Sequence, residues 1–572
     1  MDELQRVSLG ESPADLVVRG GRVLLPGTGE FAERDVLVLG DRVAALVEDG
    51  ADAVGEDTEV VDADGRHVVP GFVDAHTHLD ARQTFETLYP HALAGGTTTI
   101  VTEVATFGFL AGADGVSEFL AATADLPVTV AATVPPQPFV DTFEPPPSDE
   151  EDRAALLDLL SHERVVGVGE IDWIHVVGRD SPVEALVERA RREDEVVCAH
   201  GAGCSGEKLA ALASVVDNDH EAISADGIVE RVEAGIHAIG RTGNIRDDVE
   251  AVAGAHGRVD PAELSLSSDG VSPREMLTEG YMDAIVRSAI DAGVPPTEAI
   301  YMVTAAPARH FGLDCGALAP GRRADVVVLA DLESVEVETV VAAGEVVVRE
   351  GTPTVAPRLH DYPPEYLDSV DVELDEGRFR VPEPGGPVRA IENGPGLVST
   401  ETTAEPPVAN GELSADPDLD LAKATLLNRR PGGDGRGFTG FVTGFGLERG
   451  AVATTRTWEL PGLLVVGVDD AAMLRAARRL VEIGGGWTVD DGESVVAEFE
   501  NEVLGVCSTL PVEASVERQD AVVSALRDLG CGVDAPLLGL QTLTFPGVPA
   551  LKLTFSGYAD IRKRTVVGLA AE

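Results

Sequence analysis

Apolar strand candidates alternate with alanine-rich helical stretches from Pro70 over roughly 250 residues, the usual size of a β/α barrel. Helical stretches such as "SPVEALVERARRED" and "SPREMLTEGYMDAIVRSAIDAG" lie between some of the strands. The strand candidates end near Val73, Val101, Val130, Val168, Cys198, Ile223, Ile239 and Leu266. Alternation on this scale is typical of an eight-stranded barrel of parallel strands surrounded by helices. We therefore predict an α/β fold with a TIM-like (β/α)8 barrel over residues 69–314.

The segments on both sides of this barrel have a different pattern. Before residue 68, "DLVVRGGRVLLPG" and "DVLVLGDRVAALV" alternate around glycines, which predicts short paired strands. The same style returns in "GALAPGRRADVVVLADLESVEVETVVAAGEVVVREG" after the barrel. We expect residues 1–68 and 315–355 to form one small β-sandwich domain into which the barrel is inserted. Residues 356–572 mix strand and helix patterns, which predicts a separate C-terminal α+β domain.

Two histidines, His76 and His78, follow an apolar strand in "PGFVDAHTHLD". Alternate residues of a strand point to the same face, so both imidazoles can reach one point. Two isolated histidines spaced in this way are often only a surface feature. The test is whether more candidate ligands occur at the ends of later strands. Four do, each where a barrel strand is expected to end: Glu170, His200, His220 and Asp269.

The carboxyl ends of barrel strands converge on one face, so these six side chains are expected to meet. Imidazole and carboxylate ligands suit zinc, manganese or ferrous iron. The sequence therefore predicts a metal centre made by His76, His78, Glu170, His200, His220 and Asp269. The expected barrel contains a single lysine, Lys208, which lies outside the strand position where a modified lysine could bridge two metals, whereas Glu170 can bridge them directly.

The arrangement resembles the amidohydrolase superfamily, and more specifically its adenine deaminase family, over nearly the whole chain. The pieces that carry this resemblance in the barrel are "PHALAGGTTTIV", "GVGEIDW", "AHGAGCSGEKL", "NDHEAIS" and "EGYMDAIVRSAIDAGV". Those beyond the barrel are "GALAPGRRADVVVL", "GFVTGFGLERGAVA" and "LVEIGGGWTVDDG".

This resemblance implies hydrolytic deamination of adenine to hypoxanthine and ammonia, a reaction of purine salvage and adenine catabolism. It implies one or two divalent ions per subunit; we expect manganese, with iron or zinc as alternatives. Asp269 would take the proton of the attacking water, and Glu221 would sit beside the purine or that water. Glu103 and Arg241 are candidate substrate-binding residues, with a structural role as the alternative for Arg241.

Three segments depart from the family pattern. An Asp-Pro-His-Glu run is replaced within "TEVATFGF" (102–109), an Ile-Glu-Ser-Ser run by "LDARQ" (79–83), and a His-Asp-Ser-His-Asn run by "TWELPGL" (457–463). The metal ligands are intact, so these changes bear on the substrate. Alternatives are therefore an amidohydrolase acting on another aminopurine or a cyclic amide or amidine, and a catalytically silent, metal-stabilised binding or assembly subunit. An intact Asp269 favours an enzyme.

The charge of the chain bears on its partners. Lys and Arg number 43 against 99 Asp and Glu, a net charge of −56 that is spread over the whole chain. We interpret this as adaptation to a high-salt cytoplasm, in which screening shortens electrostatic repulsion. Nucleic acid and anionic membranes are then poor partners, because binding them needs clustered cations. We expect a small-molecule substrate and a homo-oligomer.

Targeting and redox signals agree with a cytoplasmic location. The N-terminus lacks a basic start and an apolar core of a signal peptide, and no apolar run is long enough to span a bilayer. The five cysteines contain no CxxC motif, so free thiols are expected: Cys198, Cys204, Cys315, Cys507 and Cys531.

Overall fold

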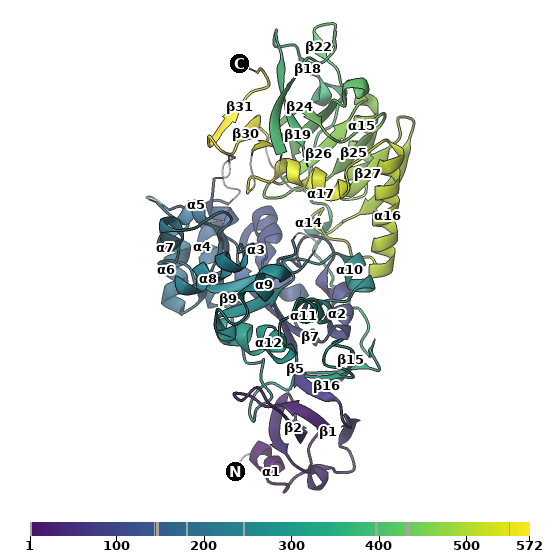
Figure 1. Ribbon diagram of the computed structural model, residues 1–572. Coiled ribbons are helices and arrows are strands. Elements are labelled where there is room, and N and C mark those ends of the chain that lie inside the picture. Colours follow the sequence, from purple (N-terminus) through teal and green to yellow (C-terminus); the bar gives the residue numbers. More distant parts are fainter. Residues whose placement is uncertain are drawn as a thin grey trace.

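The computed structural model describes residues 3–141, 143–144, 148–178, 181–243, 246–394, 399–430, 435–547 and 550–571. Three parts follow one another along the molecule (Figure 1). A small β domain with the N-terminus lies at one end, the barrel lies in the middle, and the C-terminal domain lies at the other end. Among the described residues, no helix combines the length and the apolar character needed to cross a membrane.

Eight parallel strands form the barrel sheet in chain order, which confirms the predicted α/β barrel. They are β6 (Phe72–Thr77), β7 (Thr97–Thr102), β8 (Thr129–Val134), β9 (Val165–Asp172), β10 (Val196–His200), β11 (Asn218–Asp219), β12 (His237–Arg241) and β13 (Leu264–Ser267). The strand expected to end near Ile223 ends at Asp219 instead. Ile223 is 57% exposed in the loop beyond it, so its apolar character does not mark a buried strand.

In the described part of the chain, twelve helices follow or lie between these strands, and all but α5 bury at least one side chain. They are α2 (Phe85–Ala94), α3 (Ala105–Ala122), α4 (Glu150–Asp158), α5 (Trp173–Val176), α6 (Glu184–Glu193), α7 (Glu207–Leu212), α8 (Ala225–Glu233), α9 (Val249–Ala255), α10 (Pro273–Thr278), α11 (Met282–Asp291), α12 (Pro296–Met302) and α13 (Ala305–His310). Helix α11 buries one stripe at helical spacing, formed by Met282, Ile285, Val286 and Ala289. Ser272 and Glu275 make a capping box that begins α10.

The small β domain is one hydrogen-bonded sheet of nine strands drawn from both sides of the barrel. Before the barrel it has β1 (Leu16–Leu24), β2 (Phe31–Leu39), β3 (Arg42–Val47), β4 (Glu59–Asp62) and β5 (His67–Pro70), and after it β14 (Val326–Leu329), β15 (Val337–Ala342), β16 (Glu345–Arg349) and β17 (Thr352–Pro353). Strands β5 and β14 pair antiparallel, so the chain enters and leaves the barrel side by side. Val43, Val68 and Val326 share one core, because the sheet folds around its own apolar face.

The C-terminal domain is built on an eight-stranded sheet in the order β20-β19-β24-β23-β26-β25-β27-β28. In chain order these strands are β19 (Val388–Asn393), β20 (Ser399–Ala404), β23 (Ala422–Asn428), β24 (Gly437–Thr443), β25 (Ala451–Thr454), β26 (Gly462–Gly467), β27 (Gly486–Asp490) and β28 (Val495–Glu500). The described helices of this region are α14 (Pro364–Leu367), α15 (Asp470–Glu482), α16 (Val512–Asp528) and α17 (Pro536–Gln541). Helix α15 begins at the cap residue Asp469 and buries Met473, Ala476 and Leu480.

The C-terminal domain meets the barrel at the loop that follows β6. Thr84 N donates to Ser508 O over 3.0 Å, and Ser508 N donates to Arg82 O over 3.3 Å. Gln83 Nε2 donates to Thr87 Oγ1 and also contacts the Leu510 carbonyl. This backbone bridge holds the C-terminal domain against the loop after the first barrel strand, next to the strand ends from which ligands are expected.

Candidate metal centre and its cavity

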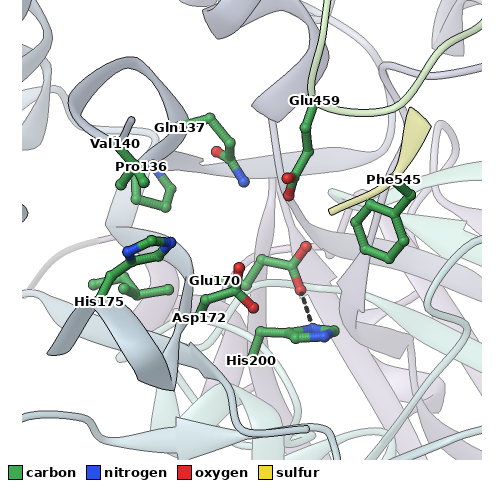
Figure 2. A pocket seen from close by; sticks show the side chains of 10 residues that line it. Pro136, Gln137, Val140, Glu170, Asp172, His175, His200, Glu459 and Phe545 are labelled. Atoms are coloured by element: carbon green, nitrogen blue, oxygen red, sulfur yellow. Dashed lines mark hydrogen bonds and ion pairs between the residues drawn. The ribbon is translucent and has the colours of Figure 1, made fainter. Parts of the chain in front are cut away.

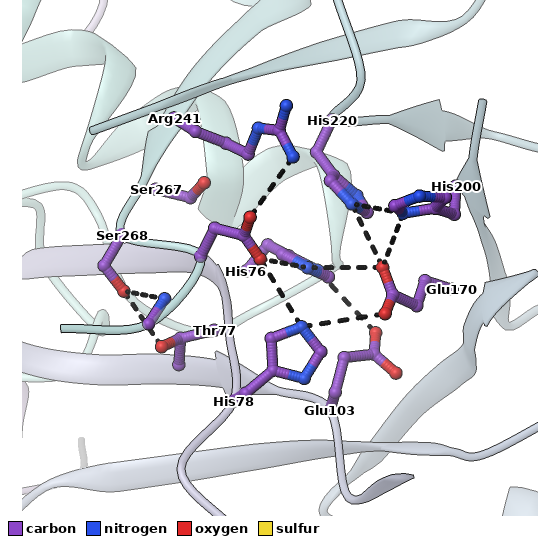
Figure 3. A network of polar contacts seen from close by, with 12 residues as sticks. His76, Thr77, His78, Glu103, Glu170, His200, His220, Arg241, Ser267 and Ser268 are labelled. Carbon is purple, nitrogen blue, oxygen red and sulfur yellow. Dashed lines mark hydrogen bonds and ion pairs between the residues drawn. The ribbon is translucent and has the colours of Figure 1, made fainter. Parts of the chain in front are cut away.

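The six predicted ligands come together at the carboxyl ends of the barrel strands (Figure 3). His76 is the last residue but one of β6, and His78 directly follows that strand. Glu170 lies two residues before the end of β9. His200 is the last residue of β10, His220 follows β11 directly, and Asp269 comes two residues after β13. Sequence reasoning placed all six at one face, and the structure brings their side chains into one cluster.

Glu170 stands at the centre of this cluster and approaches all four imidazoles. Its Oε2 lies 3.0 Å from His220 Nε2, 3.3 Å from His200 Nδ1 and 3.9 Å from His76 Nε2. Its Oε1 lies 3.7 Å from His78 Nε2. One carboxylate oxygen therefore faces three of the histidines and the other faces the fourth, so Glu170 lies among all four imidazoles.

Three overlapping groups within this cluster have the spacing needed to hold an ion. One contains His76, His78 and Asp269. The others contain His200, His220 and Glu221, and His76, Glu170 and His220. The donor set of imidazole nitrogens and carboxylate oxygens is the one that zinc, manganese and iron accept.

The protonation of the cluster also fits a cation. Burial would raise the pKa of Glu170, but hydrogen bonds with His200 and His220 outweigh it and hold this pKa well below its ordinary value. The pKa of Asp269 is also held well below its ordinary value, because hydrogen bonds with His76 and His78 outweigh the effect of its burial. The buried Nε2 of His76 has no hydrogen-bond partner among the described residues, although two carboxylates lie within 4.0 Å. The cluster therefore offers charged carboxylates and a buried imidazole nitrogen that has no hydrogen-bond partner in the described part of the chain.

A buried carboxylate that the sequence analysis did not single out, Asp219, positions two of the histidine ligands. Its Oδ1 accepts from Gly201 N over 2.9 Å and from Glu221 N over 3.0 Å, and Arg231 Nε donates to its Oδ2 over 2.6 Å. Asp219 therefore ties the residue after His200 to the residue after His220. In the sequence, its importance could have been noticed from its place in "NDHEAIS", where Asp219 directly precedes the candidate ligand His220.

Glu103 lies against His76, with Oε1 3.7 Å from the His76 Nδ1. It is 1% exposed, and it is not among the described residues that line the two cavities beside the cluster. A Cβ at position 169 would lie 2.1 Å from Glu103 Oε2, so Gly169 is the residue that makes space for this carboxylate. The structure thus places Glu103 against His76, one of the predicted metal ligands.

Arg241 and Glu221 do lie at the cavity wall, beside Asp269. Arg241 Nη1 contacts Glu221 Oε1 and lies 3.2 Å from Asp269 Oδ2, while its Nε lies 3.1 Å from Asp248 Oδ2. Its guanidinium is 3% exposed. One buried cation therefore holds both residues to which the sequence assigned catalytic roles.

A cavity of about 1270 Å³, measured to its open mouth, lies in front of the cluster. The C-terminal domain supplies part of its wall, formed by Arg456, Thr457, Trp458, Glu459 and Phe545. A smaller neighbouring space of about 400 Å³ is shared by Glu170, His200, Asp172 and Glu459 (Figure 2). Trp458 and Phe545 meet edge to face with ring centroids 5.1 Å apart. Residues 457–459 belong to one of the three segments that depart from the family pattern, so this segment contributes to the site.

Comparisons with known proteins agree along the chain. The model of the Amidohydrolase family matches residues 67–347, and that of the Adenine deaminase C-terminal domain matches residues 397–565. The adenine deaminase of Methanothrix thermoacetophila is 31% identical, over 98% of this chain and 98% of its own. That of Moorella thermoacetica is 34% identical over 99% and 97%, and that of Desulfatibacillum aliphaticivorans is 31% identical over 99% and 99%.

Proposed function

The chain belongs to the adenine deaminase family, and on that premise we propose that it hydrolyses adenine to hypoxanthine and ammonia. The observation that carries the proposal is the position of Glu170 between four histidines, with Asp269 beside them at the wall of a cavity. This arrangement supports a hydrolytic reaction, because a structural metal site has no need of an additional carboxylate that faces a cavity.

His76, His78, Glu170, His200, His220 and Asp269 would hold one or two divalent ions. We propose manganese, with iron or zinc as alternatives. A bound ion supplies Lewis-acid chemistry that makes water a stronger nucleophile at neutral pH.

Asp269 is placed for proton transfer. Its Oδ1 lies 3.5 Å from His76 Nε2 and 3.4 Å from His78 Nε2, while Arg241 holds its Oδ2. A carboxylate fixed in this way can take a proton from the attacking water and return it to the departing amine. Glu221, held by the same arginine, would hydrogen-bond the purine or the attacking water. Glu103 and Arg241 are proposed as substrate-binding residues, with Glu103 also in contact with His76.

Further parts of the proposal concern the whole protein. We propose that residues 1–68 with 315–355, 69–314 and 356–572 are its three domains, and that it works as a homo-oligomer on a small molecule in purine salvage. The net charge of −56 supports a protein adapted to high salt.

An ammonia-release assay tests the function directly. Protein loaded with manganese, iron or zinc is given adenine in molar salt, and hypoxanthine is identified as the second product. Asp269→Asn should lower the rate by about 10²–10⁴-fold, the usual contribution of a general acid–base group. If the unaltered protein is no faster than this variant, the proposed function is wrong.

A further inference from the structure

Two arginines, the half-buried Arg82 and the buried Arg456, line the cavity in front of the metal centre and make no ion pair within 4.0 Å in the described part of the chain. Arg456 is 6% exposed, and its Nε has no hydrogen-bond partner among the described residues. The buried Nη1 of Arg82 also lacks one within those residues. Arg82 comes from the barrel and Arg456 from the C-terminal domain, so two separate domains contribute cationic groups to one wall.

The buried arginines of the barrel behave differently. Arg231 donates to Asp219 over 2.6 Å, and Arg241 contacts the carboxylates of Glu221, Asp248 and Asp269. The chain contains 99 acidic residues against 43 basic ones, so a carboxylate partner is abundant. Withdrawing a cation from water without an ion pair is costly, since no close carboxylate replaces the hydration that it loses. The pair is therefore best explained by a group that comes from outside the chain.

The two guanidiniums also affect each other. Burial, and then the charge of Arg82, lower the pKa of Arg456 to about 9. Burial likewise lowers the pKa of Arg82, against the opposing charges of Glu275 and Asp269. An anion placed between the two arginines would relieve this repulsion, because each guanidinium presents a planar fork that matches a carboxylate or a phosphate.

The shape of the cavity indicates where such an anion would sit. A single space of about 1270 Å³, measured to its open mouth, reaches both arginines and the metal ligands. Trp458 and Phe545 provide an aromatic wall next to Arg456, and flat bases stack well on such surfaces. The metal ligands His78 and Asp269 line the same space as Arg82. One molecule can therefore present a base to the metal centre and an acidic substituent to the arginines.

We propose that Arg82 and Arg456 form an anion subsite in the active-site cavity, and that the preferred substrate is an aminopurine carrying a carboxylate or phosphate group. The reacting end of this substrate rests on the proposed deaminase function; the charged end rests on the two arginines alone. Adenine, which carries no such group, would be a substrate that leaves this subsite unused.

Binding of matched ligand pairs to the full-length, manganese-loaded protein tests this subsite by calorimetry. The pairs are adenosine 5′-monophosphate with adenosine, and (6-aminopurin-9-yl)acetate with 9-ethyladenine. At least one anion should bind about tenfold more tightly than its neutral counterpart, a difference that one charge-assisted contact can supply. Arg82→Gln and Arg456→Gln should each bring that ratio close to one and leave the neutral ligands nearly unchanged.

Arg246→Gln is the matched control, because Arg246 lines the same cavity but is paired with Asp248 and its side chain is 45% exposed. It should keep the preference for the anion. Since Arg82 and Arg456 belong to different domains, a folding defect in one variant does not remove the test by the other, and thermal unfolding identifies such a defect.

Three results would overturn the inference: equal binding of both members of each pair, a preference that survives both Gln variants, or a preference that Arg246→Gln abolishes as well. Binding of inorganic phosphate to the same protein and variants is measured separately. If phosphate binds through Arg82 and Arg456 but the anionic purines bind no better than neutral ones, the site takes a free anion and the substrate assignment is wrong. Adenine turnover is measured independently, so its failure and the failure of the subsite are distinguishable.

Discussion

Ser268 and Asp74 join the eighth and first strands of the barrel beneath the metal centre. Ser268 Oγ donates to Asp74 Oδ2 over 2.6 Å, and Ser268 N donates to Asp74 Oδ1 over 3.1 Å. Tyr281 also donates to Asp74 Oδ2 over 2.6 Å, and His76 N to Oδ1 over 3.3 Å. Because Ser268 precedes Asp269 and Asp74 lies two residues before His76, this network fixes two ligands relative to each other.

Replacing Ser268 by Ala removes one of the donors to the buried Asp74 carboxylate. We expect the free energy of unfolding to fall by about 1–3 kcal/mol, the usual cost of leaving a buried group short of a partner. Turnover of adenine should fall as well, since a shift of Asp269 by a fraction of an ångström misplaces the proton acceptor. Ser267→Ala is the control, because Ser267 Oγ makes only a 3.4 Å contact with Gly240 O. Equal losses of stability and turnover in both variants would refute the role of the Ser268–Asp74 hydrogen bonds.

Arg241 neutralises three buried carboxylates, and its loss should be expensive. We expect Arg241→Met to lower the free energy of unfolding by about 3–5 kcal/mol, because breaking a buried pair leaves its partners uncompensated. Arg246→Met should cost less than about 1 kcal/mol, since that side chain is 45% exposed in its pair with Asp248. Denaturant unfolding of both variants at one salt concentration measures the difference. A similar cost for both would mean that Arg241 is not a stability determinant.

Metal removal should destabilise the protein together with its activity. Dialysis against a chelator should lower the thermal midpoint, and restoring an ion to about 100 times its Kd should recover about 2.7 kcal/mol. Scanning calorimetry with manganese, iron and zinc in turn gives the order of preference. His220→Asn should lose this metal-dependent shift, whereas His256→Asn, in an exposed pair with Glu298, should keep it. A shift that persists in His220→Asn would place the ion elsewhere.

A half-buried imidazole, that of His310, predicts a pH dependence of stability. His310 stacks on His237 at 4.2 Å, and its Nε2 lies 2.9 Å from Asn218 Nδ2. Burial lowers the pKa of His310 from 6.5 to about 4. The unfolded chain therefore takes up a proton near pH 6.5 that the folded protein refuses until about pH 4. Stability is unaffected above this window and falls as the pH drops through it.

The expected loss from His310 alone is about 3 kcal/mol across the window. Unfolding of the unaltered protein and of His310→Gln, at constant salt, isolates this contribution from the titration of the many carboxylates. The variant should be the less pH-sensitive of the two. A difference between the two proteins that stays constant with pH would contradict the prediction.

The clustering of the six candidate ligands could be predicted because strand periodicity is local and the barrel imposes convergence on whatever follows each strand. His76, His200 and His220 needed only their places at strand ends. Ile223 shows the limit of this reasoning: it is apolar and follows a strand, yet it is exposed, because an apolar side chain carries no information about which face it will meet. Glu103 shows another limit, since its position after a strand does not reveal that it contacts His76 from behind.

The sequence by itself determined the barrel, the sheet that the barrel interrupts, and the six candidate metal ligands at the strand ends, since each follows from the order of strand and helix patterns along the chain. Only the tertiary structure decided that Arg82 and Arg456 share a wall of the cavity, and that Trp458 and Glu459 complete it. These residues lie in different domains and far apart in the chain. Their meeting depends on how two finished surfaces pack, which no local periodicity encodes.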